Sequence, residues 1–563
     1  MKSDLHISQA AKLKPITDIA ARLGIPRSNL ELYGDYKAKI SLDLLKKIGK
    51  KRKGKYIVVA GITPTHLGEG KTVTTIGLSM AFNRLGKSAI ACIRQPSIGP
   101  FFGVKGGGTG GGNSQVLPME DINLHLTGDI HAVAQAHNLC ASFLDNHLFR
   151  ANRLNIDKDK IFFRRVVDVN DRSLRTVRIA HGGGEAGFER ETGFCITAAS
   201  EIMAILALSE NMADLRERLG KIVVGLDKSG RAVTAEDLKV AGSMALLLRD
   251  AIKPTIVQTT EHTPCFIHTG PFANITHGNS SIIADRMALG LADYVVTESG
   301  FGADCGLEKF VDIKCRASGL KHDAVVLVAS IRALKVHSGM FKSAAGKPLD
   351  RDILRENVDL VELGCANLEK QLENTRLFGP PVVVAINKFR TDTDREISVA
   401  RRKALEHGAF ACVVTECYRS GSAGGVELSK AVTEACRATK RFTFLYPDET
   451  PIKGKIETIA RKVYGAKDVH YEKCAEENIA SFKRLGYDKL PICMAKTALS
   501  LSHDPHLKGV PKDFILPIRD VRPSIGAGFL YALCGKILTM PSLPTHPIGE
   551  KIDVDAKGKM KEL

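Results

Sequence analysis

The chain of 563 residues contains no tryptophan, and aromatic residues make up only 6% of it. It has no apolar run near the ~18 residues that a membrane-spanning helix needs. No module interleaves aromatic with basic side chains, so a nucleic-acid-binding protein is not expected despite the net charge of +18. The first residues include an early acid and no hydrophobic stretch. We therefore expect no secretory signal, no membrane partner and a cytoplasmic protein, with a mitochondrial location left open.

The thirteen cysteines lack any short, repeated spacing of the kind that binds zinc. We expect reduced thiols, as in a cytosol-like compartment, and no cysteine-bound metal. Lysine and arginine are also spread along the chain, and one dense run, at 46–55, precedes an apolar strand. This distribution favours attraction of small anionic ligands over binding of nucleic acid.

A phosphate-binding pattern is present near the N-terminus. The apolar run 56–62 is followed by Thr65, His66, Leu67, Gly68, Glu69, Gly70, Lys71 and Thr72. The last three residues match the end of a P-loop, in which backbone N–H groups cradle phosphates, lysine adds a positive charge and the hydroxyl ligates Mg²⁺. Thr65 stands where the pattern has glycine. A helix expected over 72–85, a capping Gly86 and a strand expected over 88–93 supply the frame that the pattern requires.

From Tyr56 onward, apolar strands alternate with amphipathic helices, which indicates a mostly parallel sheet flanked by helices. Further strands are expected at 254–259, 294–297, 324–330, 381–387 and 411–415. The fold class predicted is α/β, with a P-loop NTPase-like large domain over 1–305. Two smaller α/β domains are expected over 306–446 and 447–563, the second after a proline-containing break at 446–451.

Candidate site residues follow the second strand. Arg94 and Gln95 stand at its carboxyl end, which in a parallel sheet lies at the same edge as the P-loop. Arg94 can there offer a planar guanidinium to a phosphoryl or carboxylate group. Six glycines occupy seven positions at 106–112, and because glycine loses more entropy on folding than other residues, we expect a loop that approaches a ligand closely. Asp129, in the polar stretch 120–131, is a candidate for holding metal-bound water or positioning a substrate.

These segments resemble formate–tetrahydrofolate ligases, also called 10-formyltetrahydrofolate synthetases. The matching segments are residues 14–17, 63–72, 94–97, 119–131, 165–171, 190–194, 270–274, 297–304 and 490–496. The resemblance extends from Met1 to about Asp555. It accounts for Thr65, since the family also has threonine at the first P-loop position.

The resemblance implies a ligase that forms a C–N bond between formate and tetrahydrofolate, with or without a polyglutamate tail. MgATP and formate give formyl phosphate and ADP; N10 of tetrahydrofolate then attacks the formyl carbon, and phosphate leaves. Lys71 and Arg94 neutralise the transferring group, which mainly requires positioning and positive charge. The resemblance also implies a homotetramer and a monovalent cation, K⁺ or NH₄⁺. Residues 65–72 would bind ATP, with Thr72 on Mg²⁺, and the formyl phosphate region would include Gln95, Gly106, Gly107 and Asp129.

Family members stack the pterin ring on aromatic side chains, which implies roles for Phe301 and Tyr418. Tyr418 stands where the family has tryptophan, and a tyrosine offers a smaller stacking face. Gln95 and Asn113 also depart from residues common in the family, glutamate and tyrosine respectively.

Two candidates follow other strands. Asn387 is a candidate for contact with the adenine, and Glu298 for the surroundings of the Mg²⁺.

Two other functions are open at this point. A P-loop switch ATPase would control a partner through its nucleotide state. The glycine-rich loop, Arg94 and the Phe301/Tyr418 pair argue against it, because a switch needs no second substrate pocket. A ligase-like protein with impaired catalysis would act as a binding protein. The retained P-loop argues against that reading, whereas the departures at Asn113 and Tyr418 leave it open.

Overall fold

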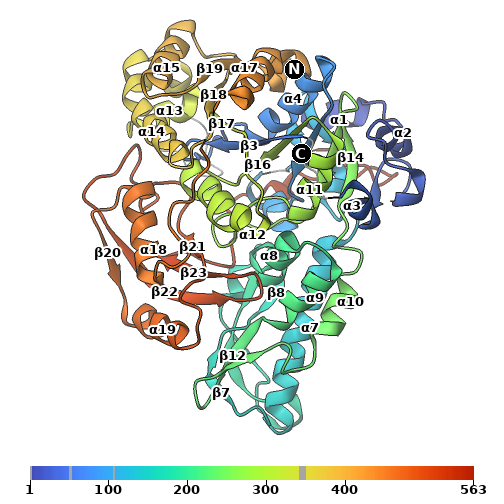
Figure 1. The fold of residues 1–563 in the computed structure, drawn as a ribbon, viewed down its shortest axis with the longest axis vertical. Coiled ribbons are helices and arrows are strands. Elements are labelled where there is room, and N and C mark those ends of the chain that lie inside the picture. The colour runs from blue at the N-terminus through green and yellow to red at the C-terminus, as the bar shows by residue number, and fades with distance from the viewer. Residues whose placement is uncertain (1–2, 50–53, 106–107, 342–349, 440, 563) are drawn as a thin grey trace.

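The computed structural model describes residues 3–49, 54–105, 108–341, 350–439 and 441–562. A large sheet flanked by helices occupies its upper part (Figure 1), with the strand order β1-β2-β14-β15-β4-β16-β3-β17-β18-β19. From β15 to β19, every neighbouring pair is parallel, whereas β1, β2 and β14 pair antiparallel. The predicted α/β class with a mostly parallel sheet is therefore confirmed.

Most strands of this sheet match predicted strands within a few residues, whereas the three at 30–32, 38–40 and 264–267 were not predicted. The bounds of the strands are Leu30–Leu32 (β1), Ala38–Ile40 (β2), Lys55–Gly61 (β3), Ala89–Ile93 (β4), Thr255–Thr259 (β14), Pro264–Ile267 (β15), Tyr294–Glu298 (β16), Ala324–Ala329 (β17), Val382–Asn387 (β18) and Ala411–Thr415 (β19). The glycine-rich hairpin, Gly110–Gly111 (β5) and Ser114–Leu117 (β6), joins the sheet through β14. Strands β3, β4, β17 and β18 are buried almost throughout, as expected for parallel strands covered on both faces.

Helices join these strands and cover the sheet. The main ones are α1 (Asp4–Ala10), α4 (Lys71–Arg84), α6 (Met119–Asn123), α7 (Asp129–Arg150), α8 (Glu201–Leu208), α11 (Ile282–Leu291), α13 (Ile331–His337), α14 (Val358–Arg376), α15 (Asp394–Glu406), α16 (Cys417–Ser420) and α17 (Val426–Arg437). The predicted helix over 72–85 is α4, and Gly86 follows it with φ +73°. Among the described helices, none combines the length and apolarity needed to cross a bilayer.

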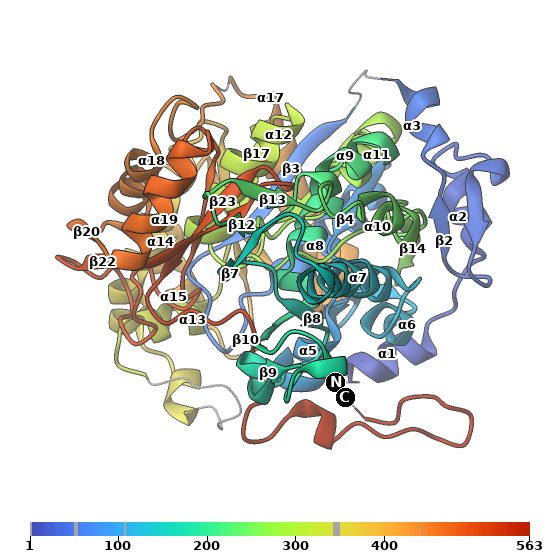
Figure 2. The same cartoon turned by 90° about the horizontal axis from the view of Figure 1, so that it is seen from below.

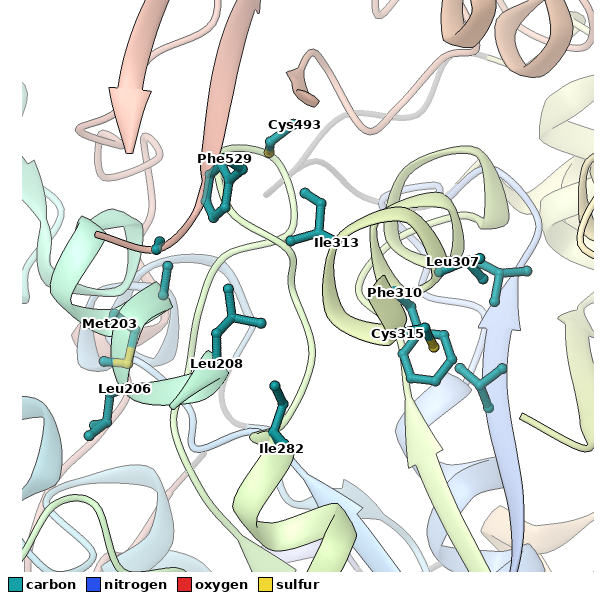
Figure 3. Packing of buried hydrophobic residues seen from close by; sticks show 14 of the residues in the cluster. Met203, Leu206, Leu208, Ile282, Leu307, Phe310, Ile313, Cys315, Cys493 and Phe529 are labelled. Carbon is teal, nitrogen blue, oxygen red and sulfur yellow. The ribbon is translucent and has the colours of Figure 1, made fainter. Parts of the chain in front are cut away.

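A second sheet lies in the C-terminal part of the chain, in the order β20-β22-β23-β21. Its strands are Asp468–Tyr471 (β20), Ile515–Ser524 (β22), Phe529–Cys534 (β23) and Ile492–Ala495 (β21). One cluster of buried side chains continues from the large sheet into this smaller one. Figure 3 shows part of it, in which α8, α11, the segment 303–315 and the strands of Cys493 and Phe529 contribute neighbouring side chains. The division into three domains at 305 and 446 stays a prediction. Strands β17–β19 fall within the second predicted domain, yet they extend the same sheet as β3 and β4 of the first.

Asp129 lies in a buried ion pair that joins β2 to α7. Its Oδ2 accepts a hydrogen bond from Lys39 Nζ at 2.6 Å, and the two side chains are only 3% and 0% exposed. Its Oδ1 accepts a bond from Thr127 Oγ1 at 3.1 Å. Burial raises the pKa of Asp129 and lowers that of Lys39, and the attraction between the two opposes both shifts. In this structure Asp129 thus holds the sheet to a helix, and its place in the formyl phosphate region stays a prediction.

We expect Lys39→Met to lower the apparent melting temperature by about 3–5 °C, because Asp129 would be left buried without its charged partner. Differential scanning fluorimetry measures the shift. Lys46→Met is a matched control, since Lys46 pairs with Asp43 at 2.9 Å but both side chains are exposed. That variant should change the melting temperature by less than about 1 °C. Equal shifts for the two variants would contradict a stabilising role for the buried pair.

Candidate functional site

The P-loop leaves the carboxyl end of β3 and enters α4 at Lys71. Gly70 has φ +85°, a left-handed conformation that favours glycine. Thr65 is buried, and its backbone N and its Oγ1 donate hydrogen bonds to Glu69 Oε1 at 2.7 and 3.1 Å. The Leu67 N–H donates to Thr65 Oγ1 at 3.2 Å. The threonine at the first P-loop position therefore closes the loop through its own hydroxyl, which glycine could not do.

Two charged side chains of the loop, Lys71 and Glu69, lie close together. Lys71 is folded back over the strand end, since a Cβ added to Gly61 would lie 3.1 Å from its Cδ. Its Nζ lies 3.5 Å from Glu69 Oε2. His66 and Gly68 are exposed. Partial loss of solvent around the ring, and to a smaller extent the nearby Lys508, lowers the pKa of His66. The free N–H groups at the start of α4 and the ammonium of Lys71 together make a site suited to an anion.

Glu298 connects the P-loop to Arg94. Strand β16 lies between β3 and β4, so its last residue, Glu298, stands between the two strand ends. Glu298 Oε2 accepts a hydrogen bond from Thr72 Oγ1 at 2.8 Å, and Oε1 lies 4.0 Å from a terminal nitrogen of Arg94. Arg94 also donates to the Pro271 carbonyl at 3.1 Å. Burial lowers the pKa of Arg94, and the charge of Glu298 opposes that shift. The structure thus brings together the predicted residues Lys71, Thr72, Arg94 and Glu298.

Several buried polar atoms beside Arg94 find no hydrogen-bond partner among the described residues. The backbone N of Gln95 donates to Thr269 O at 2.7 Å, but neither atom of its side-chain amide is paired. The same holds for Thr269 Oγ1, Asn274 Oδ1, Asn279 Oδ1 and both ring nitrogens of His277. A buried polar atom without a partner costs about 1–3 kcal/mol, so such a group points to a polar ligand or ordered water. The sequence marked 270–274 as a matching segment but assigned no residue in 269–279, although this segment between β15 and α11 is rich in short polar side chains.

The glycine-rich hairpin packs against Tyr418. Gly106 and Gly107 lie outside the described residues. Gly112 has φ +57°, and a Cβ added to it would lie 2.0 Å from the Tyr418 carbonyl oxygen. The Asn113 N–H donates to that same oxygen at 2.8 Å. The sequence suggested that these glycines approach a ligand; at Gly112 the close approach is to the protein's own backbone.

The aromatic candidates lie on different strand ends. Phe301 follows β16 and has φ +63°, whereas Tyr418, in α16, follows β19, and β3, β17 and β18 lie between the two strands. Phe389, which the sequence did not single out, follows β18, the neighbour of β19. The guanidinium of Arg332 lies 4.1 Å from the centre of its ring. Strand order therefore places Phe389 one strand from Tyr418.

The predicted adenine contact, Asn387, supports the P-loop. It is buried, and its Nδ2 donates to the Glu69 carbonyl at 3.1 Å. At the start of the loop, the Thr63 carbonyl contacts a ring nitrogen of His337 at 2.7 Å, and its Oγ1 accepts bonds from Asn367 and Gln371. None of these three residues was predicted, because nothing local in α13 or α14 marks them.

The comparisons with known proteins cover the whole chain. The profile of the formate–tetrahydrofolate ligase family matches residues 2–563. A protein of Roseiflexus castenholzii with that name is 56% identical over 563 residues, covering 100% of both chains. Proteins of the same name from Saccharopolyspora erythraea and Desulforamulus reducens are 54% and 53% identical, each covering at least 98% of both chains.

A full-length match at this identity shows the family. This chain belongs to the formate–tetrahydrofolate ligases.

Proposed function

We propose that the chain ligates formate to tetrahydrofolate with ATP, giving 10-formyltetrahydrofolate, ADP and phosphate, at the sheet edge where Lys71, Thr72 and Arg94 converge. Family membership supports the reaction and does not favour a switch ATPase. The location of the proposed site rests on the position of the Glu298 carboxylate, which contacts Thr72 and lies 4.0 Å from Arg94. An edge that combines a P-loop with a second cation and unpaired polar groups suits an anionic intermediate as well as ATP.

In the first step, a formate oxygen attacks the γ-phosphorus of ATP, the bond to the β-phosphate oxygen breaks, and ADP leaves. Residues 65–72 form the ATP site, in which the N–H groups at the start of α4 and Lys71 hold the phosphates, while Arg94 faces the transferring group. Thr72 and Glu298 are the residues that would hold Mg²⁺, Thr72 through its hydroxyl and Glu298 through its hydrogen bond with that hydroxyl. The ion, when bound, neutralises phosphate charge. Gln95, with its unpaired amide, lies next in the chain to Arg94 and would contact the formyl phosphate, together with Gly106 and Gly107.

In the second step, N10 of tetrahydrofolate attacks the formyl carbon, phosphate leaves, and N10 loses its proton. N10 is an aniline-type nitrogen that is largely neutral at neutral pH, so the step needs no strong general base. Tyr418 and Phe301 are proposed to stack on the folate rings, and the neighbouring strand end adds Phe389 as a third candidate. Asn387 is retained as a candidate for the adenine. On the resemblance alone we also propose a homotetramer, a K⁺ or NH₄⁺ requirement and a cytoplasmic location.

The reaction is tested by the formation of 10-formyltetrahydrofolate, read by absorbance after acid converts it to methenyltetrahydrofolate. We expect product only when formate, ATP and tetrahydrofolate are all present. Each substrate is omitted in turn as the control. ATP hydrolysis that needs neither formate nor folate would overturn the ligase assignment and favour the switch ATPase. Absence of product with intact ATP binding would favour the impaired ligase.

Arg94→Ala should abolish detectable turnover, a loss of about 10²–10³-fold or more by analogy with lost oxyanion donors. ATP affinity should stay within about tenfold, because the P-loop provides most phosphate contacts. Turnover is measured with the assay above, and ATP affinity by isothermal titration calorimetry. Arg249→Ala is the control, since Arg249 is exposed and lies beside Asp250. A variant of Arg94 whose main defect is ATP binding would contradict the proposed role.

Tyr418→Trp should lower the KM for tetrahydrofolate by about two- to fivefold, because indole offers a larger stacking face and its N–H can donate a hydrogen bond, as the phenol does. The chain has no tryptophan, so this variant carries a single indole whose fluorescence tetrahydrofolate should quench. Tyr36→Trp, at an exposed position, controls for absorption of light by the folate. An unchanged KM and quenching equal to that of the control would place Tyr418 outside the pocket.

A further inference from the structure

The first helix, α1, contacts both the glycine-rich hairpin and Tyr418. Asp4, its first residue, accepts hydrogen bonds on Oδ1 from the Tyr418 hydroxyl at 2.8 Å and from the Gly112 N–H at 2.9 Å. The Asp4 carbonyl accepts a bond from Gln115 Nε2 at 3.0 Å. One carboxylate oxygen therefore joins two segments that are 306 positions apart in the sequence (418 minus 112).

The rest of α1 is anchored independently of these contacts. Gln9, in its last turn, donates hydrogen bonds to Glu120 Oε1 at 2.9 Å and to the Met560 carbonyl at 2.8 Å. Figure 2 shows α1 beside α6 and near both chain ends. Because α1 is held at this end, Asp4 presents its carboxylate from a fixed position.

The phenol makes this contact specific to a tyrosine. Tyr418 is part-buried, and a part-buried hydroxyl is stabilised by a hydrogen-bond partner. Burial, and after it the hydrogen bond to Asp4 and the charge of Asp4, raises the pKa of Tyr418 to about 12. The hydroxyl thus stays protonated and donates to a charged acceptor, which is stronger than a bond between neutral groups. Asp4 therefore holds the hydroxyl end of the Tyr418 side chain, and the Asn113 N–H holds the Tyr418 backbone carbonyl.

We propose that Asp4 is a positioning residue for the folate site, fixing the Tyr418 ring and the glycine-rich hairpin in one arrangement. The inference rests on the proposed function, because it takes Tyr418 as a wall of the folate pocket. An aromatic ring that is free to change rotamer must be ordered when tetrahydrofolate binds, and that ordering weakens binding. Asp4 orders the ring beforehand, so its loss should raise the KM for tetrahydrofolate and leave the KM for ATP unchanged.

A double-mutant cycle between Asp4→Ala and Tyr418→Phe tests this coupling. We expect Asp4→Ala to raise the KM for tetrahydrofolate by about five- to tenfold, with kcat and the KM for ATP within about twofold. In the Tyr418→Phe background, the same change should have at most about a third of that effect. Asp4→Asn keeps an acceptor oxygen and should restore the KM to within about threefold of the parent value.

Ser3→Ala is the matched control for the stability of α1. The Ser3 hydroxyl accepts a hydrogen bond from His6 N at 3.2 Å and caps the helix, without a bond to Tyr418. It should leave the KM for tetrahydrofolate unchanged. A rise equal to that of Asp4→Ala would overturn the inference, and so would equal effects of Asp4→Ala in the two backgrounds.

Two further outcomes separate the inference from the function on which it rests. Should Asp4→Ala not fold, Tyr418→Phe alone removes the phenol bond and leaves α1 intact; it must raise the KM by about threefold, and an unchanged KM overturns the inference. If the parent protein forms 10-formyltetrahydrofolate and no Asp4 variant changes the KM for tetrahydrofolate, only the positioning role of Asp4 is overturned. If the parent protein forms no 10-formyltetrahydrofolate, the proposed function itself is overturned.

Discussion

The carboxylate of Glu298 connects the start of α4 to Arg94. Lys71 begins α4 and Arg94 directly follows β4, so both stand at one edge of the sheet, where two positive charges repel each other. Strand β16 separates β3 from β4 and places Glu298 between them. Its two oxygens face Thr72 and Arg94. The site can therefore keep its positive groups in place before a phosphate arrives, which is the preorganisation that electrostatic catalysis requires.

The P-loop is held by side chains from much later in the chain. The backbone of Glu69 accepts a hydrogen bond from Asn387 at the end of β18, and Thr63 is bonded by residues of α13 and α14. The contacts of Asn387 with the Glu69 carbonyl and of His337 with the Thr63 carbonyl fix the backbone of the loop, and neither uses the N–H groups at the start of α4. A loop fixed in this way loses little entropy when phosphate binds, so more of the contact energy appears as affinity or rate.

The sequence predicted what depends on local pattern. The P-loop, α4, β14 and the parallel strands β3, β4 and β16–β19 follow from apolar runs and turn residues, whereas β1, β2 and β15 were not predicted. Arg94 could be placed near Lys71 because parallel strands share one carboxyl edge. Strand order could not be predicted, since it depends on how the connecting helices pack. For that reason the position of β16, the support that Asn387 gives the P-loop, and the separation of Phe301 from Tyr418 by three strands were not foreseen. The roles of Gly106, Gly107, Phe301 and Tyr418 in binding stay predictions.

The hydroxyl of Thr72 is already oriented by Glu298 in the protein without ligands. A threonine hydroxyl has one proton and two lone pairs, and here the proton is donated to Glu298. The lone pairs consequently point away from that carboxylate and stay available to a cation. A negative Glu298 alone would repel the phosphates of ATP, so the proposed site would favour nucleotide that arrives with a divalent ion. The same carboxylate that neutralises Arg94 in the free protein would then also fix the hydroxyl that such an ion binds.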